Sequence, residues 1–263
     1  GNGATFKEVS KSVVERIELP LPPPEEQKRI AAILDQADAL RRLRQRAIDR
    51  IDTLAQSIFF EMFGGDRSTS TLAALGEIAD FVSGSTPSKD NPNYWTGTLP
   101  WVTPKDMKRR VIKDSIDHVS DDVVRSGKLK LIPCGTPLIV VRGMILAHTV
   151  PIATTAEDVT INQDMKAIRV DPSSAIPEFV SWALQAKHNH LLGVVSTAAH
   201  GTKRIDMREL KSFKIPLPTM DEQRKFLNAV SSVQELRTQA NESFVQESKL
   251  FASLQHRAFR GDL

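Results

Sequence analysis

The chain has 263 residues, 40% of them hydrophobic and 25% charged, with a net charge of +3 and a pI near 9.0. This length suffices for one large domain or two modest ones. No apolar run approaches the roughly 18–20 residues of a membrane span, and no signal peptide is recognisable, so we expect a cytoplasmic protein without membrane contact. The single cysteine, Cys134, excludes disulfides within the chain and CxxC-type zinc sites.

The first 16 residues resemble a later part of the chain. The sequence starts with Gly rather than Met, so a trimmed tag or a fragment of a longer protein is expected. At a separation of 196 residues, four positions correspond in character: Val9, Ser10, Val14 and Ile17 with Ile205, Asp206, Leu210 and Phe213. We interpret residues 1–16 as the tail of a domain whose intact version ends near residue 214.

The repeat continues in two proline-rich stretches, LPLPPPEEQKRI at 19–30 and IPLPTMDEQRKF at 215–226. Prolines favour extended backbone before a helix, and Pro24 suits a first helical turn, where its missing N–H costs nothing. In the second copy, Thr219 and Glu222 have the spacing of a capping box. Both stretches therefore predict a strand end, a turn and a helix start.

Each stretch is followed by a predicted helix of about 39 residues with apolar residues in steps of three and four, as in a coiled coil. The first seam comprises Ile30, Ile33, Ala37, Leu40, Ala47, Ile51, Leu54 and Ile58, with Arg44 in the one skipped position. The second comprises Phe226, Ala229, Val233, Leu236, Ala240, Leu250 and Leu254, with polar Ser243 and Glu247 between them. On pattern alone, such helices are more often simple packing or dimerisation elements than functional devices.

Between the two predicted helices, the sequence consists of short apolar runs interrupted by Gly, Pro, Asn and Asp. Residues 136–150 and 165–170 are predicted to be strands and 176–192 a helix. This middle region is therefore expected to be a mixed α+β domain with long polar loops.

Catalytic motifs are hard to find. The sequence NPNY at 91–94 has some likeness to the loop with which amino-methyltransferases hold a base, but an Asn-Pro turn is favoured. No phosphate-binding loop, HExxH or GxSxG motif is present. We expect that the chain is not an enzyme and holds no metal or cofactor itself.

Basic residues in the polar loops suit contact with phosphates and base edges. The candidates for DNA contact are Lys105, Lys108, Arg109, Arg110, Lys203 and Arg204, with Lys89 and Arg142 weaker. The charge run at 105–110 could equally be a solvated surface. Trp95 and Trp101 are expected to anchor loops rather than stack on bases, and Asn162, Gln163 and Asp164 to be structural.

Three longer stretches resemble the specificity subunit of type I restriction–modification enzymes. They are LGEIADFVSGSTPSKDNPNYWTGTLPWVTPKDM at 75–107, INQDMKAI at 161–168 and KIPLPTMDEQRKF at 214–226. The similarity extends over essentially the whole chain. It implies target recognition domains, each followed by a long helix, with the two helices packed as an antiparallel coiled coil.

The resemblance implies a domain order: the tail of one recognition domain (1–16), a first spacer helix (17–66), a complete recognition domain (67–214) and a second spacer helix (215–263). Each recognition domain would read one half of a bipartite sequence in double-stranded DNA. The helices would dock modification subunits, which carry the methyltransferase chemistry, and a restriction subunit would complete the enzyme. S-adenosylmethionine, ATP and Mg²⁺ are expected on those partners. The expected partner contacts in this chain are Glu26, Gln27, Glu222 and Gln223.

The chain departs from the family in holding one complete recognition domain. We therefore expect it to read one half-site, and its open helix end favours self-association into a homodimer. Two alternatives stay open. The chain could serve a solitary methyltransferase or a fused restriction–modification enzyme, or it could be a structural adaptor without DNA recognition.

Overall fold

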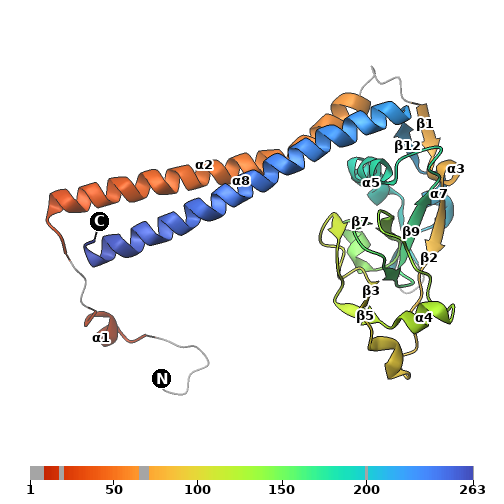
Figure 1. The fold of residues 1–263 in the computed structure, drawn as a ribbon, viewed down its shortest axis with the longest axis horizontal. Helices are drawn as coiled ribbons and strands as arrows, with labels where there is room; N and C mark the ends of the chain where they lie inside the picture. The colour runs from red at the N-terminus through yellow and green to blue at the C-terminus, as the bar shows by residue number, and fades with distance from the viewer. Residues whose placement is uncertain (1–8, 18–20, 65–70, 199–200, 263) are drawn as a thin grey trace. The chain divides into compact units, whose positions relative to one another are not determined.

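The computed structural model describes residues 9–17, 21–64, 71–198 and 201–262 (Figure 1). The chain forms two compact units: residues 1–54 with 233–263, and residues 55–232. The predicted boundary between spacer helix and recognition domain, at residues 66 and 67, lies outside the described residues. The first eight residues of the predicted tail lie outside them as well.

The first unit is built on two long helices that run side by side in opposite directions (Figure 1). They are α2 (Pro24–Phe63) and α8 (Met220–Arg260), with 40 and 41 residues, and the short α1 (Lys11–Val14) precedes them. The guanidinium of Arg41 lies 5.4 Å from the ring centroid of Phe251, and Arg44 pairs with Glu247; the partner number falls along α8 as it rises along α2, so the helices are antiparallel. The predicted antiparallel pair of long helices is therefore confirmed.

The two charged residues in the predicted seams face each other across this helix pair. Arg44 Nη2 donates to Glu247 Oε1 at 2.9 Å, although the two residues are 203 positions apart. Glu247 Oε2 is buried without a hydrogen-bond partner. A half-buried ion pair between apolar layers contributes to register more than to stability, because any other alignment would leave each charge facing apolar side chains.

The predicted seam of α2 is confirmed at Ile30, Ala37, Ile51 and Ile58, which are half-buried, but in places between them it is displaced by one residue. Leu40 and Leu54 are 62% and 41% exposed, whereas Ile48 and Ala55 are 4% and 5% exposed. Apolar residues occupy both of these adjacent positions, so periodicity alone could not choose between them. The same shift leaves two predicted seam residues of α8 on the surface, Leu236 and Leu250.

The second unit contains a mixed α+β domain together with the adjoining ends of the long helices. Its strands are β1 (Thr71–Ala74), β2 (Ala79–Ser83), β3 (Leu99–Val102), β4 (Val111–Ile112), β5 (Asp117–Val119), β6 (Pro137–Val140), β7 (Ile152–Thr155), β8 (Thr160–Ile161), β9 (Met165–Val170), β10 (Val195–Thr197), β11 (Lys203–Ile205) and β12 (Lys214–Leu217). Its helices are α3 (Leu75–Ile78), α4 (Asp121–Arg125), α5 (Pro177–Ala186), α6 (His188–Gly193) and α7 (Met207–Ser212), with 3₁₀ turns η1 (Pro92–Trp95) and η2 (Met144–Ala147).

The main sheet has the strand order β2-β9-β6-β7-β4. A smaller sheet has the order β5-β3-β8, and two further pairs are β1–β12 and β10–β11. Every residue of the central strand β6 is buried, as expected for an apolar strand covered on both faces. Helix α5 packs against β6, β7 and β9. The predicted α+β class is confirmed.

The structure confirms some of the strands and helices predicted for the middle region and changes others. The strand at 165–170 is confirmed as β9. The helix expected at 176–192 is divided into α5 and α6 at Lys187. The strand expected over 136–150 is wrong beyond Val140, because Gly143 has a φ of +132°, which the apolar pattern could not show and which an L side chain rarely adopts. The 3₁₀ turn η2 follows it.

The internal repeat is visible in structure. Helix α2 begins at Pro24 as predicted, and the predicted capping box before α8 is present: Thr219 N donates to Glu222 Oε2 at 2.9 Å, and Glu222 N donates to Thr219 Oγ1 at 3.4 Å. Helix α1 also occupies the position equivalent to α7. The two differ in burial: Val14 on α1 is 55% exposed, whereas its counterpart Leu210 is fully buried.

An aromatic cluster joins the ends of the long helices to α5 inside the second unit. Phe59 and Phe63 come from α2, Phe179 and Trp182 from α5, and Phe226 from α8. Their ring centroids are 5.2–5.9 Å apart, mostly in edge-to-face geometry, which aromatic rings prefer. This cluster is the base on which the recognition domain is anchored to both helices.

Candidate nucleic-acid interface

Three predicted DNA contacts, Arg142, Lys203 and Arg204, come together beside the end of β6. Arg142 and Arg204 form an antiparallel bridge, and Ile205 N–H donates to Val141 O at 2.9 Å. The hairpin β10–β11 is thereby joined to the chain leaving the central strand. Backbone pairing therefore sets these positions, and their side chains are not needed to hold them.

The structure adds Lys166, which the sequence analysis missed. Its Nζ donates to Ser83 Oγ at 2.6 Å, and partial burial together with the nearby charge of Arg142 lowers the pKa of Lys166. The sequence around Lys166 does not identify it as part of a basic site, because the residues that surround it in the structure come from other strands. Arg142, Lys166, Lys203 and Arg204 are called the hairpin cluster below.

The hairpin cluster has little acidic compensation. Among the described residues, no ion pair involves any of its four members. The pKa of Asp206 is lowered chiefly by the backbone N–H of Arg208, and Arg204 contributes through its charge without pairing. Such uncompensated cations on a surface attract a polyanion, and the attraction falls as salt rises.

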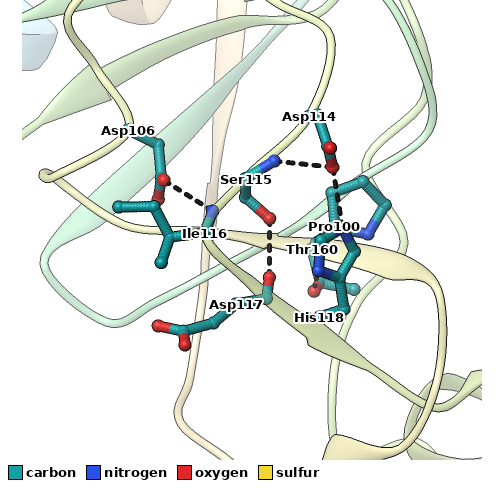
Figure 2. A network of polar contacts seen from close by, with 8 residues as sticks. All are labelled: Pro100, Asp106, Asp114, Ser115, Ile116, Asp117, His118 and Thr160. Carbon is teal, nitrogen blue, oxygen red and sulfur yellow. Dashed lines mark hydrogen bonds and ion pairs between the residues drawn. The ribbon is translucent and has the colours of Figure 1, made fainter.

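A second group, Lys105, Lys108 and Arg109, lies exposed on the loop after β3. Asp106 organises this loop: its Oδ2 accepts from Thr103 N at 2.8 Å, and its Oδ1 accepts from Ile116 N at 2.9 Å (Figure 2). The loop is therefore held by carboxylate-to-backbone hydrogen bonds, which leaves the cations free to face solvent.

The same network continues past Ile116 (Figure 2). Asp114 Oδ1 accepts from Ser115 N at 2.8 Å and contacts His118 Nε2 at 2.7 Å. The Ser115 hydrogen bond, followed by that of His118, lowers the pKa of Asp114. Asp114 and Asp117 make this end of the loop acidic, which opposes contact with phosphates there.

Arg110 is placed apart from the other candidates. Its guanidinium lies 3.1 Å from the ring centroid of Trp182, and burial lowers its pKa to about 10, with Glu178 acting in the opposite direction. The side chain is committed to a stacking contact with α5. The stacking contact gives Arg110 a packing role, but the residue remains exposed by its surface area, so it stays a candidate for DNA contact.

The two tryptophans hold the loop that carries Lys89 through hydrogen bonds to its backbone. Trp95 Nε1 donates to Ser88 O at 3.2 Å, and Trp101 Nε1 donates to Ser85 O at 3.1 Å. Their expected anchoring role is confirmed. Lys89 itself is exposed, and Asn91 caps the 3₁₀ turn η1, which confirms an Asn-Pro turn at 91–94.

Residues 162–164 form the turn between β8 and β9. Asn162 Oδ1 accepts from Asp164 N at 3.1 Å, so these two residues have the expected structural role. Gln163 is exposed and accepts a hydrogen bond from Thr86 Oγ1. The backbone at Gly84 can lie close to this turn only because glycine has no side chain: a Cβ there would lie 2.1 Å from Ile161 O.

The predicted partner contacts divide between surface and interior. Glu26 pairs with Arg29 at 2.7 Å, and Gln27 is exposed, so both remain candidates. Glu222 belongs to the capping box. Gln223 is fully buried, so its prediction as a partner contact is corrected. Its amide is used inside the domain, where Nε2 donates to Pro218 O and Oε1 accepts from Ile176 N, each at 2.9 Å.

Replacing Gln223 by Met should destabilise the second unit by about 2 kcal/mol, because two polar backbone groups would lose their partner in a buried site. Gln27 supplies a matched control, since its Nε2 donates to Pro22 O at 2.7 Å in the equivalent turn but is exposed. Gln27→Met should change stability by less than roughly 0.5 kcal/mol. Urea unfolding of both variants tests this. Equal effects would contradict the buried role of Gln223.

The described residues contain no group of three or more His, Cys, Asp or Glu side chains able to hold a metal ion. None of the helices in the described part of the chain is both long and apolar enough to cross a membrane.

Comparison with known proteins identifies the family. The model of the type I restriction modification DNA specificity domain matches residues 1–53 and 68–243, and the chain belongs to this family. It is 32% identical over 177 residues to the EcoR124I/EcoR124II specificity subunit of the type I restriction enzyme from Escherichia coli. That match covers 67% of this chain and 44% of the relative.

Solved structures share the fold. The HsdS subunit from Thermoanaerobacter tengcongensis has a TM-score of 0.62 at 23% identity, covering 100% of this chain and 65% of the other. A chain from a type I restriction–modification system, solved in a study of complex assembly and conformational transition, has a TM-score of 0.71 at 23% identity. It covers 99% of this chain and 66% of that one. This chain is therefore shorter than the proteins it resembles.

Proposed function

We propose that the chain is a non-catalytic DNA-recognition subunit of a type I restriction–modification enzyme, acting in the cytoplasm and reading one half-site of a bipartite duplex target. The hairpin cluster is the observation that carries this proposal. Lys166 lies on β9, Lys203 and Arg204 lie on β11, and Arg142 follows β6, and backbone pairing holds these positions in advance of binding. Phosphate contacts of this kind position a protein on duplex DNA, while nearby polar side chains such as Gln163 suit base edges.

The long helices fit a docking role. They expose apolar residues beyond their mutual seam, including Leu43 at 55% and Val245 at 50%. We propose that modification subunits bind there, with a restriction subunit completing the enzyme. S-adenosylmethionine, ATP and Mg²⁺ would then be held by those partners, and this chain would contribute target choice.

A second copy of the chain is the proposed source of the other half-site. The tail residues Val9, Val14 and Ile17 are 67%, 55% and 58% exposed. Their counterparts Ile205 and Leu210 are buried within the recognition domain. Apolar residues that are core in one repeat and exposed in the other favour association with a further recognition domain.

The mass of the assembly with the cognate modification subunit, measured by light scattering with and without DNA, tests this function. Two modification subunits with two copies of this chain are expected. One copy with one modification subunit would contradict the homodimer and leave half-site reading intact. Association without any effect of DNA on mass or methylation would favour a structural adaptor. No association would remove the docking role.

A further inference from the structure

The 3₁₀ turn η2 presents an apolar tip beside the hairpin cluster. Met144 is 63% exposed and Ile145 37%, while Leu146 is 1% exposed and anchors the turn in the core. Gly143 N–H donates to Lys203 O at 3.0 Å, and this bond joins the start of the turn to β11. The tip is therefore rigidly attached between two members of the hairpin cluster, Arg142 before it and Lys203 across from it.

Most of Met144 is exposed to solvent at this tip. Its side chain contributes little to the core, and exposing it to water forgoes the stabilisation that burial would bring. Its surroundings are cationic, and the flanking Arg142 is itself exposed. An apolar tip with a basic rim suits a ligand that carries negative charge around an apolar group.

Exposure alone does not identify such a tip, as Ile116 shows. It is 66% exposed, yet Asp114 and Asp117 flank it in the sequence, and its backbone N–H donates to Asp106 Oδ1 at 2.9 Å (Figure 2). Negative charge on both sides opposes approach of a phosphate backbone. The charges of the neighbouring residues therefore favour Met144 over Ile116 as a contact for DNA.

We propose that Met144 reads thymine, by packing against the thymine methyl group in the major groove of duplex DNA. This inference rests on the proposed function. The thymine methyl is the apolar group that base edges display in that groove. The groove is about 12 Å wide, and a four-residue 3₁₀ turn is about 8 Å long, so the tip fits between the two phosphate strands. The flexible thioether side chain adapts to such a contact.

The test uses duplexes selected by the wild-type chain in complex with its cognate modification subunit. Each thymine of the selected half-site is replaced in turn by deoxyuridine, which differs by one methyl group. At one position, wild type is expected to lose about fourfold in affinity, the value of one buried methyl. Met144→Ala should bind the thymine duplex more weakly by at least about fourfold and be indifferent to the deoxyuridine change at that position.

Leu72→Ala is the matched control, since Leu72 is 58% exposed on β1, where it pairs with Pro216. It should keep both the affinity and the deoxyuridine effect. Thermal melting of each variant checks that the fold is intact. A wild type that is indifferent to deoxyuridine everywhere, a half-site without thymine, or a Met144→Ala variant that keeps the deoxyuridine effect would overturn the inference alone. A wild type that selects no sequence would overturn the proposed function with it.

Discussion

Replacing Phe226 by alanine should destabilise the second unit by about 3–5 kcal/mol, the largest stability effect we expect from a single substitution. Phe226 is fully buried and contacts rings from two other helices, α2 and α5, with Phe59 at 5.4 Å and Phe179 at 5.9 Å between ring centroids. Removing it leaves a cavity where α2, α5 and α8 meet. Urea unfolding should show the change as a lower midpoint with an unaltered slope.

The fluorescence of Trp182 can report this unfolding, because its ring centroid lies 5.9 Å from that of Phe226. The control is Phe259→Ala on the same helix, where the side chain is 66% exposed. It should change stability by less than roughly 0.5 kcal/mol. A loss below about 1 kcal/mol for Phe226→Ala would mean that the cluster collapses around the cavity and is not the anchor described above.

The double substitution of Arg142 and Arg204 by alanine should lower affinity for duplex DNA about a hundredfold at about 0.1 M salt. Each lost phosphate contact should also reduce the slope of log affinity against log salt by about 0.9. The backbone bridge between these residues does not depend on their side chains, so the hairpin should remain in place. Titrations between about 50 and 200 mM salt, with the assembled complex, measure both quantities.

A matched double substitution removes the same charge elsewhere. Arg125 pairs with Asp122 at 3.0 Å and Arg169 with Asp80 at 3.2 Å, so both are already compensated. Replacing these two by alanine should leave the salt slope nearly unchanged. If both double variants lowered the slope equally, general net charge would explain binding, and the hairpin cluster would have no special part in it.

Much of the fold could be predicted because local chemistry and global structure agree. The proline-rich repeat predicted both helix starts, and Pro24 and the Thr219 capping box lie where expected. About half of the coiled-coil seam was predicted; the positions between, such as Leu40 and Leu54, are displaced by one residue, since apolar residues occur on two adjacent stripes of each helix. The choice depends on which residues face each other across the pair, and the contact between Arg44 and Glu247 joins distant parts of the chain.

The candidate site was predicted less completely. Charge and loop composition pointed to Arg142, Lys203 and Arg204, and the structure brings these together. The stacking of Arg110 on Trp182 could not be predicted, because a charge run cannot show which member turns toward a tryptophan 72 residues later. Lys166 was missed for the converse reason. It occurs inside a strand, and only the pairing of β9 with its neighbours places it in the cluster.

Selection of bound duplexes from a random library, by the chain with its cognate modification subunit, tests the central claim most directly. If the chain reads DNA sequence, one short motif should be enriched. Its enrichment should weaken when Arg142 and Arg204 are replaced. Bound duplexes without any enriched motif would contradict sequence recognition, even if the complex assembled and bound DNA tightly.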